Sequence, residues 1–186
     1  MSETELATKV LRDVIEGLDS AGIPHMLVGS FASTSYSTPR TTQDIDIVID
    51  PTPLSLGRFI ASLDRDRFYV ESTAQQALAA RDQFNMIDLT TNWKVDLIIL
   101  KDNPFGRSEF DRRVRTDVFG VDLSIATAED TVLAKLEWAA MGGSDRQVAD
   151  AAAVLAVQGD RLDQAYLDRW AAELGVSGLL ARARQG

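Results

Sequence analysis

The segment from residue 25 to residue 50 constrains the chain most, because it places two acids inside a strand. A short run, His25 to Val28, leads into Gly29-Ser30, and thirteen residues later the strand DIDIVID begins at Asp44. Side chains alternate between the faces of a strand, so Asp44 and Asp46 point the same way while Ile45 and Ile47 point into the core. Two carboxylates so close on one face repel each other unless a cation lies between them. A divalent metal would remove that conflict.

A third carboxylate completes the arrangement that a two-metal site needs. Asp96 is the best candidate, because it interrupts the apolar strand from Trp93 to Leu100, where an unpaired charge is costly. Asp88 is the second choice, and we do not expect an ion pair between Asp96 and Lys94. Two metals held by these acids could activate an attacking hydroxyl and stabilise a leaving pyrophosphate.

The turn between the two strands is suited to phosphate. Gly29 lets a phosphate approach the backbone closely, and Ser30 can offer its hydroxyl and the N–H groups that follow it at a helix start. An ordinary turn is the alternative interpretation. We expect Gly29 and Ser30 to contact the triphosphate of a nucleotide.

Composition limits the metal and the partners. The chain has one histidine and no cysteine, so a metal site must rest on carboxylates, which favour Mg²⁺ or Mn²⁺. The net charge is −9, from 19 basic and 28 acidic residues, which is a poor field for a nucleic acid and suits a cationic substrate. The one concentrated basic patch is either a binding surface for RNA phosphates or a solvated face with interleaved acids; it comprises Arg107, Arg112, Arg113 and Arg115.

Hydrophobic periodicity predicts a mixed α/β layout followed by helices. Ser2 and Glu5 fit a capping box that opens a helix over 3–20. Strands are predicted at 25–28, 44–50, 67–71, 84–89 and 93–100, with a strand pair over 118–125 around Gly120. Further helices are predicted at 53–65, from Thr127 to Met141, and at 145–157, 163–174 and 176–184, with a loop and short helix over 101–116. The predicted units are a catalytic core, 1–126, and a helical region, 127–186.

No segment predicts a membrane or secretory element. No apolar run approaches the roughly 20 residues that a membrane span needs. The N-terminus carries acids and an amphipathic pattern instead of a basic start with an apolar core. We expect a cytoplasmic protein with no membrane partner.

The order of these residues resembles the DNA-polymerase-β-like nucleotidyltransferase superfamily. The matching elements are Val28-Gly29-Ser30, then Asp44-Ile45-Asp46 in a strand, then Asp96, within about residues 25–100. The resemblance implies an α/β (α+β) nucleotidyltransferase fold, in which helices flank a small mixed β-sheet and a C-terminal helical bundle follows. It also implies an enzyme that moves an NMP from an NTP to an acceptor, with Asp44, Asp46 and Asp96 as metal ligands.

The C-terminal third is similar to the AbiEii/MenT-type nucleotidyltransferases, which include toxins of bacterial toxin–antitoxin systems. Thr127-Ala128-Glu129-Asp130, Lys135-Leu136, Arg146 and Asp150 carry this similarity. It implies that Lys135 contacts the NTP phosphates, that Asp150 has a catalytic role and that Arg40 is the basic residue before the acid pair. From the residues alone, Lys135 could equally expose its amine at the surface, and Asp150 could pair with Arg146. The chain departs from the family in having Gly-Ser-Phe-Ala where Gly-Gly-Thr-Ala is common.

Three functions therefore remain open at the level of sequence. The first is a toxin-like enzyme that modifies tRNA or another RNA and has a cognate antitoxin. The second is a nucleotidyltransferase that acts on a cationic small molecule, such as an aminoglycoside, or on a protein. The third is a nucleotide-binding or antitoxin module without turnover.

Overall fold

The computed structural model describes residues 2–37 and 44–185, and over these residues helices and strands alternate before a run of helices. The first half contains α1 (Glu3–Ala21), β1 (His25–Val28), α2 (Gly29–Thr34), β2 (Asp44–Ile49), α3 (Pro53–Ser62), β3 (Phe68–Val70), α4 (Ala74–Ala80), β4 (Gln83–Asp88) and β5 (Lys94–Ile99). The second half contains α5 (Pro104–Arg112), β6 (Val114–Val118), β7 (Val121–Ile125), α6 (Ala128–Gly142), α7 (Asp145–Gln158), a 3₁₀ turn (Gly159–Arg161), α8 (Gln164–Glu173) and α9 (Ser177–Ala183).

The described strands form one mixed sheet. Its seven strands lie in the order β3-β4-β5-β2-β1-β7-β6. Strand β2 pairs parallel with β5 and antiparallel with β1, and β1 pairs parallel with β7. This confirms the predicted α/β class with a mixed sheet flanked by helices.

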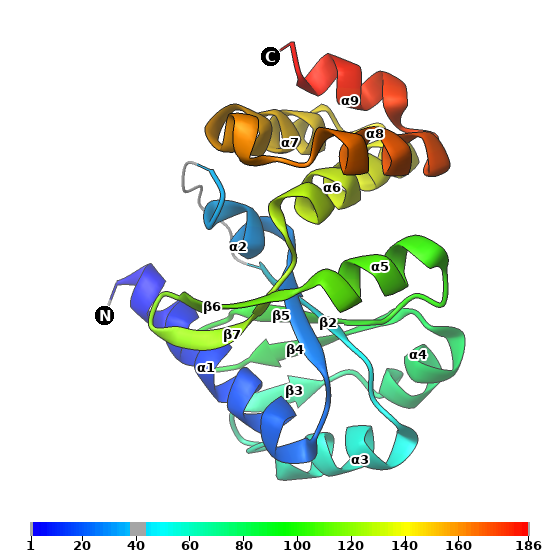
Figure 1. Ribbon diagram of the computed structural model, residues 1–186. Helices are drawn as coiled ribbons and strands as arrows, with labels where there is room; N and C mark the ends of the chain where they lie inside the picture. The colour runs from blue at the N-terminus through cyan, green and yellow to red at the C-terminus, as the bar shows by residue number, and fades with distance from the viewer. Residues whose placement is uncertain (1, 38–43, 186) are drawn as a thin grey trace.

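The two faces of the central strands have different chemistry because side chains alternate along them. On one face, Ile45 and Ile47 of β2 are fully buried in the main core, together with apolar residues of α1 and α3. On the other face, Asp46 and Val48 lie toward α5 and α6, above a small apolar cluster that includes Met26 and Phe110. Figure 1 shows α1 running along the sheet and α5 on the other side. One face builds the core and the other is available for a site.

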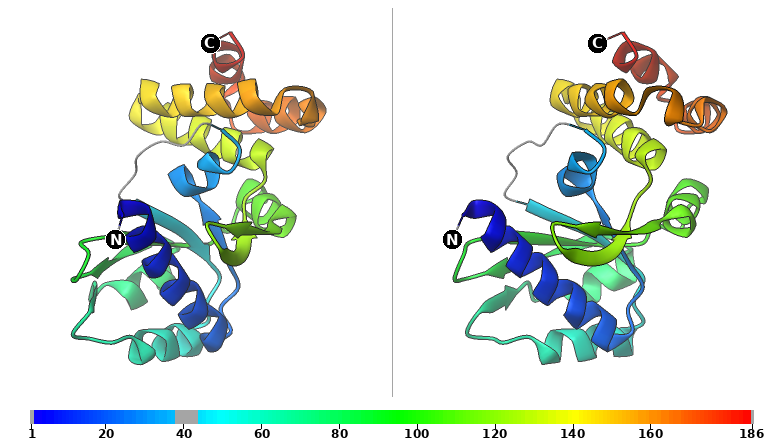
Figure 2. Two further views of the ribbon diagram at one scale, coloured as in Figure 1. Left: turned by 90° about the vertical axis from the view of Figure 1, so that its left-hand side faces the viewer. Right: turned by 60° about the vertical axis from the view of Figure 1, so that its left-hand side comes forward.

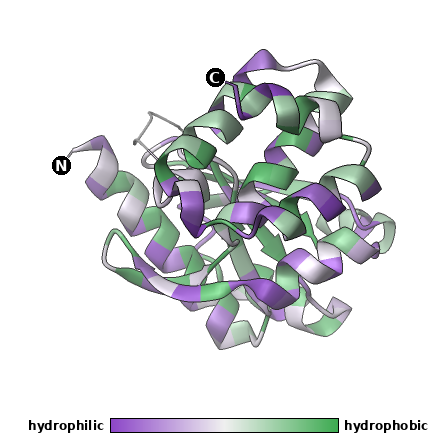
Figure 3. Ribbon diagram, turned by 45° about the horizontal axis from the view of Figure 1, so that its top comes forward, coloured by the Kyte–Doolittle hydropathy of each residue, from purple (hydrophilic) through white to green (hydrophobic). Residues whose placement is uncertain are grey.

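Helices α6 to α9 pack around a second hydrophobic cluster, which also includes Phe105 of α5. Thr127 caps α6, with its hydroxyl oxygen 3.2 Å from the Asp130 backbone nitrogen. Asp130 is fully buried and joins this layer to α5 and α8, because it accepts hydrogen bonds from Arg112 at 3.1 Å and from Tyr166 at 2.5 Å. Figure 2 shows these helices as a layer above α2 and the sheet. In Figure 3 the strands are mainly hydrophobic, whereas the helices alternate.

Several element boundaries differ from the predicted ones. Helix α4 was not predicted, because Thr73 provides no side-chain cap and the seven residues form barely two turns. Helix α3 ends at Ser62 instead of 65, and strand β6 begins at Val114 instead of near 118, with its hairpin turn at Phe119-Gly120. No described helix combines the length and hydrophobicity that crossing a membrane requires.

Candidate active site

Strand register brings the predicted acids together. In the parallel pair β2–β5, Asp46 lies opposite Asp96 and Asp44 lies opposite Lys94. Residues in register on parallel strands point to the same face, so all four side chains emerge on the side that faces α5 and α6. The structure therefore groups carboxylates that lie about fifty residues apart in the sequence.

Lys94 lies among these acids, and the expectation that it would not pair with Asp96 was wrong. Its ammonium nitrogen is 2.9 Å from Asp96 Oδ2 and 3.7 Å from Asp44 Oδ1. Strand residues two apart share a face, which is why this contact forms. The ammonium group supplies part of the positive charge that the apposed carboxylates require, and its hydrogen bond to Asp96, with the other neighbouring acids, raises the pKa of Lys94.

Gly29 is the residue against which Asp46 rests. Strand β1 places Val28 opposite Asp46, and the chain then turns at Gly29 with φ of +66°. A Cβ at this position would lie 2.0 Å from Asp46 Oδ2, so any other residue would collide with the carboxylate. Glycine is required here both for the backbone conformation and for the close approach of the acid.

Asp46 and Asp96 are electrostatically unsatisfied. Burial, together with the carboxylates of Asp96 and Asp44, raises the pKa of Asp46 to about 6. Asp96 is only 8% exposed, and its Oδ1 has no hydrogen-bond partner among the described residues. A buried carboxylate oxygen without a donor is costly, and a bound cation would remove the cost.

Lys135 of α6 approaches the acids from the helical layer. The side chain is buried, at 4% exposure, and does not lie along the surface. Its ammonium nitrogen is 3.0 Å from Asp150 Oδ2 and 3.4 Å from Gln147 Oε1, both on α7. Its positive charge opposes the rise in the pKa of Asp46.

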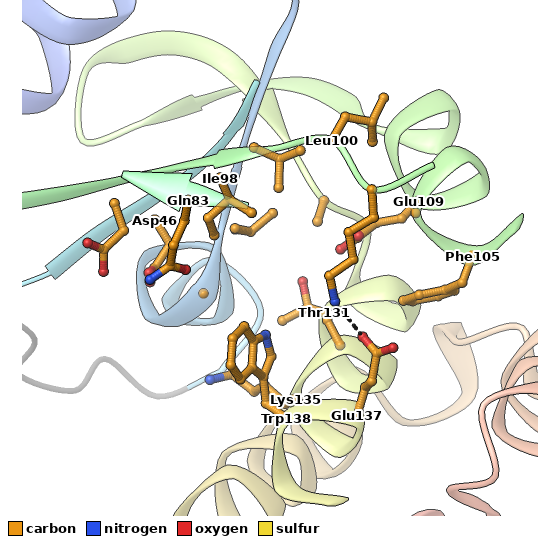
Figure 4. Close-up of a pocket in the computed structure, with 18 of the residues that line it drawn as sticks. Asp46, Gln83, Ile98, Leu100, Phe105, Glu109, Thr131, Lys135, Glu137 and Trp138 are labelled. Carbon is orange, nitrogen blue, oxygen red and sulfur yellow. Dashed lines mark hydrogen bonds and ion pairs between the residues drawn. The ribbon is translucent and has the colours of Figure 1, made fainter. Parts of the chain in front are cut away.

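The acids and Lys135 line one cavity of about 290 Å³ between the sheet and α5–α6. Asp46 and Gln83 lie on one side of it and Phe105, Glu109 and Glu137 on the other, as Figure 4 shows. Gly29, Ser30 and Asp96 also contribute to its wall. The predicted phosphate turn, two of the three predicted metal ligands and the predicted phosphate-binding lysine thus share a single cavity.

The described residues contain no group of three or more acidic or histidine side chains arranged to hold a metal ion. Asp44 contributes to the electrostatics of Asp46, but its side chain is 54% exposed. Asp46 and Asp96 form the close pair, and their oxygen atoms are the ligand type that Mg²⁺ and Mn²⁺ prefer. The donor set therefore fits a hard divalent cation, with the buried Oδ1 of Asp96 as the atom that most needs one.

The arginines of the predicted basic patch already have partners within the protein. Arg40 lies outside the described residues. Arg107 pairs with Asp102, and Arg115 lies 3.0 Å from Asp122. Arg112 lies 3.1 Å from the buried Asp130, and Arg113 donates to the Phe110 carbonyl while stacking on its ring.

Sequence reasoning missed part of the cavity wall. Glu109 was grouped with a solvated charged face, yet it is 9% exposed and lines the cavity. Burial, then the carboxylates of Asp130 and Glu137, raise the pKa of Glu109 to about 8, while Lys101 lowers it. The spacing of Glu109 from Phe105, four residues along a helix, places both on one face and was the available indication.

Comparisons with known proteins agree on the fold. No family model matches the chain, and no curated protein matches it by sequence. The structure resembles ANT(2'')-Ia bound to adenylyl-2''-tobramycin, with a TM-score of 0.60, 11% identity and coverage of 97% of this chain and 99% of that chain. It also resembles the solution structure of that antibiotic-resistance factor, with a TM-score of 0.55, 12% identity and coverage of 92% and 96%.

A third similar structure is an antigenic nucleotidyltransferase-like protein from Paracoccidioides brasiliensis. Its TM-score is 0.58 at 18% identity, with coverage of 98% of this chain and 93% of that chain. The likeness spans the sheet and the C-terminal helices together. The chain has the nucleotidyltransferase fold.

Proposed function

We propose that this protein is a metal-dependent nucleotidyltransferase that transfers an NMP from an NTP to a hydroxyl group of an acceptor. The observation that carries the proposal is the apposition of Asp46 and Asp96 beside Gly29, in a cavity that Lys135 also lines. The fold and the order of the motif residues support the same reaction.

In the proposed reaction, the acceptor oxygen attacks the α-phosphorus, a new P–O bond forms, and the bond to the bridging oxygen breaks to release pyrophosphate. Gly29 and Ser30 bind the triphosphate from the sheet side, and Lys135 binds it from the helical side. Asp150 and Gln147 hold the Lys135 ammonium group in position. Asp96, in register with Asp46 at the cavity wall, receives the proton of the acceptor hydroxyl.

Asp46 and Asp96, with Asp44, would hold Mg²⁺ or Mn²⁺, which when bound supplies charge neutralisation for the phosphates and lowers the pKa of the acceptor hydroxyl. Lys94 keeps Asp44 and Asp96 oriented toward the same point. Catalysis then depends on positioning and electrostatics, as transfer of phosphorus groups generally does.

The acceptor that we favour is a small cationic molecule. The chain carries a net charge of −9, and the cavity wall contributes four acids, Asp46, Asp96, Glu109 and Glu137, against two lysines. The four arginines of the candidate RNA surface are already engaged by acids or a carbonyl. The adenylylated tobramycin in one similar structure is an acceptor of this class.

An RNA acceptor in a toxin–antitoxin system of the AbiEii/MenT type is the second candidate. Its support is the helical segment with Lys135 and Asp150, which the structure places together at 3.0 Å. This candidate predicts that induction of the wild-type protein arrests growth and that induction of Asp46→Ala does not.

One labelling experiment separates the candidates. The protein is incubated with α-³²P-labelled NTPs and Mg²⁺ in the presence of separated small-molecule, protein and RNA fractions. We expect label in the small-molecule fraction with the wild type and none with Asp46→Ala. Label in RNA favours the second candidate. Nucleotide binding without transfer to any fraction would mean a non-catalytic module and would overturn the proposal.

A further inference from the structure

One wall of the cavity contains an acid that pairs with no other described residue. Glu109 of α5 is more than nine-tenths buried, and no hydrogen bond or ion pair joins its carboxyl to another described residue. Thr131 of α6 lines the same cavity at 4% exposure, and its hydroxyl also has no hydrogen-bond partner among the described residues. Buried polar groups normally have partners, so both side chains have hydrogen-bonding capacity that a bound ligand could use.

A cation from the chain itself already lies on this wall. The Lys101 ammonium nitrogen is 3.4 Å from Glu137 Oε2 and 5.8 Å from the centre of the Trp138 ring. The dashed line at Glu137 in Figure 4 marks this ion pair. An ammonium group with a carboxylate on one side and an indole face on another is a standard mode of amine recognition. The position of Lys101 therefore indicates that this wall can bind an ammonium group.

We infer that Glu109, Glu137 and Trp138 form a subsite for a primary ammonium group of the acceptor, and that the Lys101 ammonium group occupies it in the free protein. This inference rests on the proposed function and specifies where the acceptor binds. Glu109 lines the same cavity as Lys101, Glu137 and Trp138, and an incoming ammonium group gives its carboxyl a partner. The subsite shares its cavity with Asp46 and Asp96, so a bound amine brings neighbouring hydroxyl groups of the same molecule toward the acids.

The test uses a ligand pair that differs only in charge: the trisaccharide of glucosamine and its fully N-acetylated form. Calorimetric titration without NTP or metal makes the outcome independent of transfer. We expect the glucosamine trisaccharide to bind and the acetylated form not to bind. Glu137→Gln should weaken binding by roughly tenfold, since it removes a charge-assisted hydrogen bond. Glu109→Gln should weaken binding by a smaller factor, because the Glu109 carboxyl must release its proton before it pairs with the ammonium group.

Lys101→Met gives the sharpest result. If Lys101 competes with the ligand, its removal should strengthen amine binding by roughly fivefold, because the vacated subsite no longer has to release a cation. Glu173→Gln, an exposed acid on α8, is the matched control and should bind as the wild type does. A subsite elsewhere would leave the Glu109, Glu137 and Lys101 variants unchanged.

Equal binding of the charged and acetylated forms, no binding of either, or weaker binding by Lys101→Met would overturn the inference. Failure of the proposed function looks different, since the wild type would then transfer no label from any NTP whatever its affinity for amines.

Discussion

Two aspartates in neighbouring strands, Asp88 in β4 and Asp96 in β5, are almost equally buried and have opposite surroundings. Asp88 is fully buried and accepts hydrogen bonds from Arg67 at 2.7 and 2.9 Å and from Thr90 at 2.6 and 2.9 Å. Although burial opposes it, these bonds hold the pKa of Asp88 below its usual value. Asp88 is a structural carboxylate, because both of its oxygens accept hydrogen bonds.

Asp96 lacks such a full set of hydrogen-bond donors. One of its oxygens contacts Lys94 at 2.9 Å, the other has no partner among the described residues, and Asp46 lies opposite it on the adjacent strand. Burial, and then the repulsion by Asp96 and Asp44, raises the pKa of Asp46 to about 6. Burial alone therefore does not distinguish a structural acid from a functional one; the number of donors around it does.

The largest effect is expected on transfer. Asp46→Asn should lower the rate of NMP transfer on the order of a thousandfold, because it removes a charge that acts directly on the reacting phosphates. The free energy of unfolding should not fall, since the change relieves repulsion with Asp96. Transfer assays and urea unfolding of the same preparation measure both. Retained transfer would contradict the assignment of the acids.

Asp88→Asn should show the reverse pattern. Among the described residues it leaves Arg67 with Asp13 as its one carboxylate partner, at 2.6 Å, and it should lower the free energy of unfolding by about 3 kcal/mol. Transfer per folded molecule should stay at the wild-type value, provided that it is measured well below the midpoint of unfolding. A selective loss of transfer would show that Asp88 belongs to the site.

Lys135→Met tests whether the buried lysine binds phosphate or only packs. We expect NTP affinity to fall roughly thirtyfold, which corresponds to about 2 kcal/mol for a buried charge contact. Lys135→Arg should recover part of the affinity if charge matters. Unchanged NTP affinity in Lys135→Met, measured by equilibrium dialysis, would leave Lys135 with a structural role.

The last prediction concerns the pH dependence of stability and Glu109, a third buried acid. Its pKa of about 8 lies above the value of 4.5 for a free side chain, so the folded state holds the proton more tightly than the unfolded state. Stability should therefore fall as pH rises from about 4.5 to 8, by roughly 1 kcal/mol per unit in the upper part of that range.

Glu109→Gln removes the titrating group and should flatten this fall. Urea unfolding of both proteins at pH 5, 6, 7 and 8 gives the comparison. Parallel stability curves for the two proteins would show that the Glu109 carboxyl ionises freely in the folded state.

Much of the sheet and its acid pair could be predicted, because alternation along DIDIVID fixes which side chains share a face. Gly29 was predicted as a turn residue, but its role in making room for Asp46 depends on the register of β1 and β2. The pairing of Lys135 with Asp150 joins two helices, and local spacing within either helix does not contain it.

Glu109 shows the main limit of reasoning from charge patterns. The neighbouring arginines and acids on α5 are typical of a solvated face in the sequence. In the structure, Arg112 pairs with Asp130 and Glu109 lines the cavity. The packing of α6 and α8 against α5 decides this, and it is a long-range property of the chain.

Mn²⁺ binding in the presence of a non-hydrolysable NTP analogue tests most directly whether the Asp46–Asp96 pair is a metal and nucleotide site. Titration is followed by electron paramagnetic resonance for the wild type, for Asp46→Asn, and for Asp122→Asn, an exposed strand acid of β7 that serves as control. The account predicts tight Mn²⁺ binding by the wild type and Asp122→Asn and its loss in Asp46→Asn. Equal Mn²⁺ binding by all three proteins would contradict it.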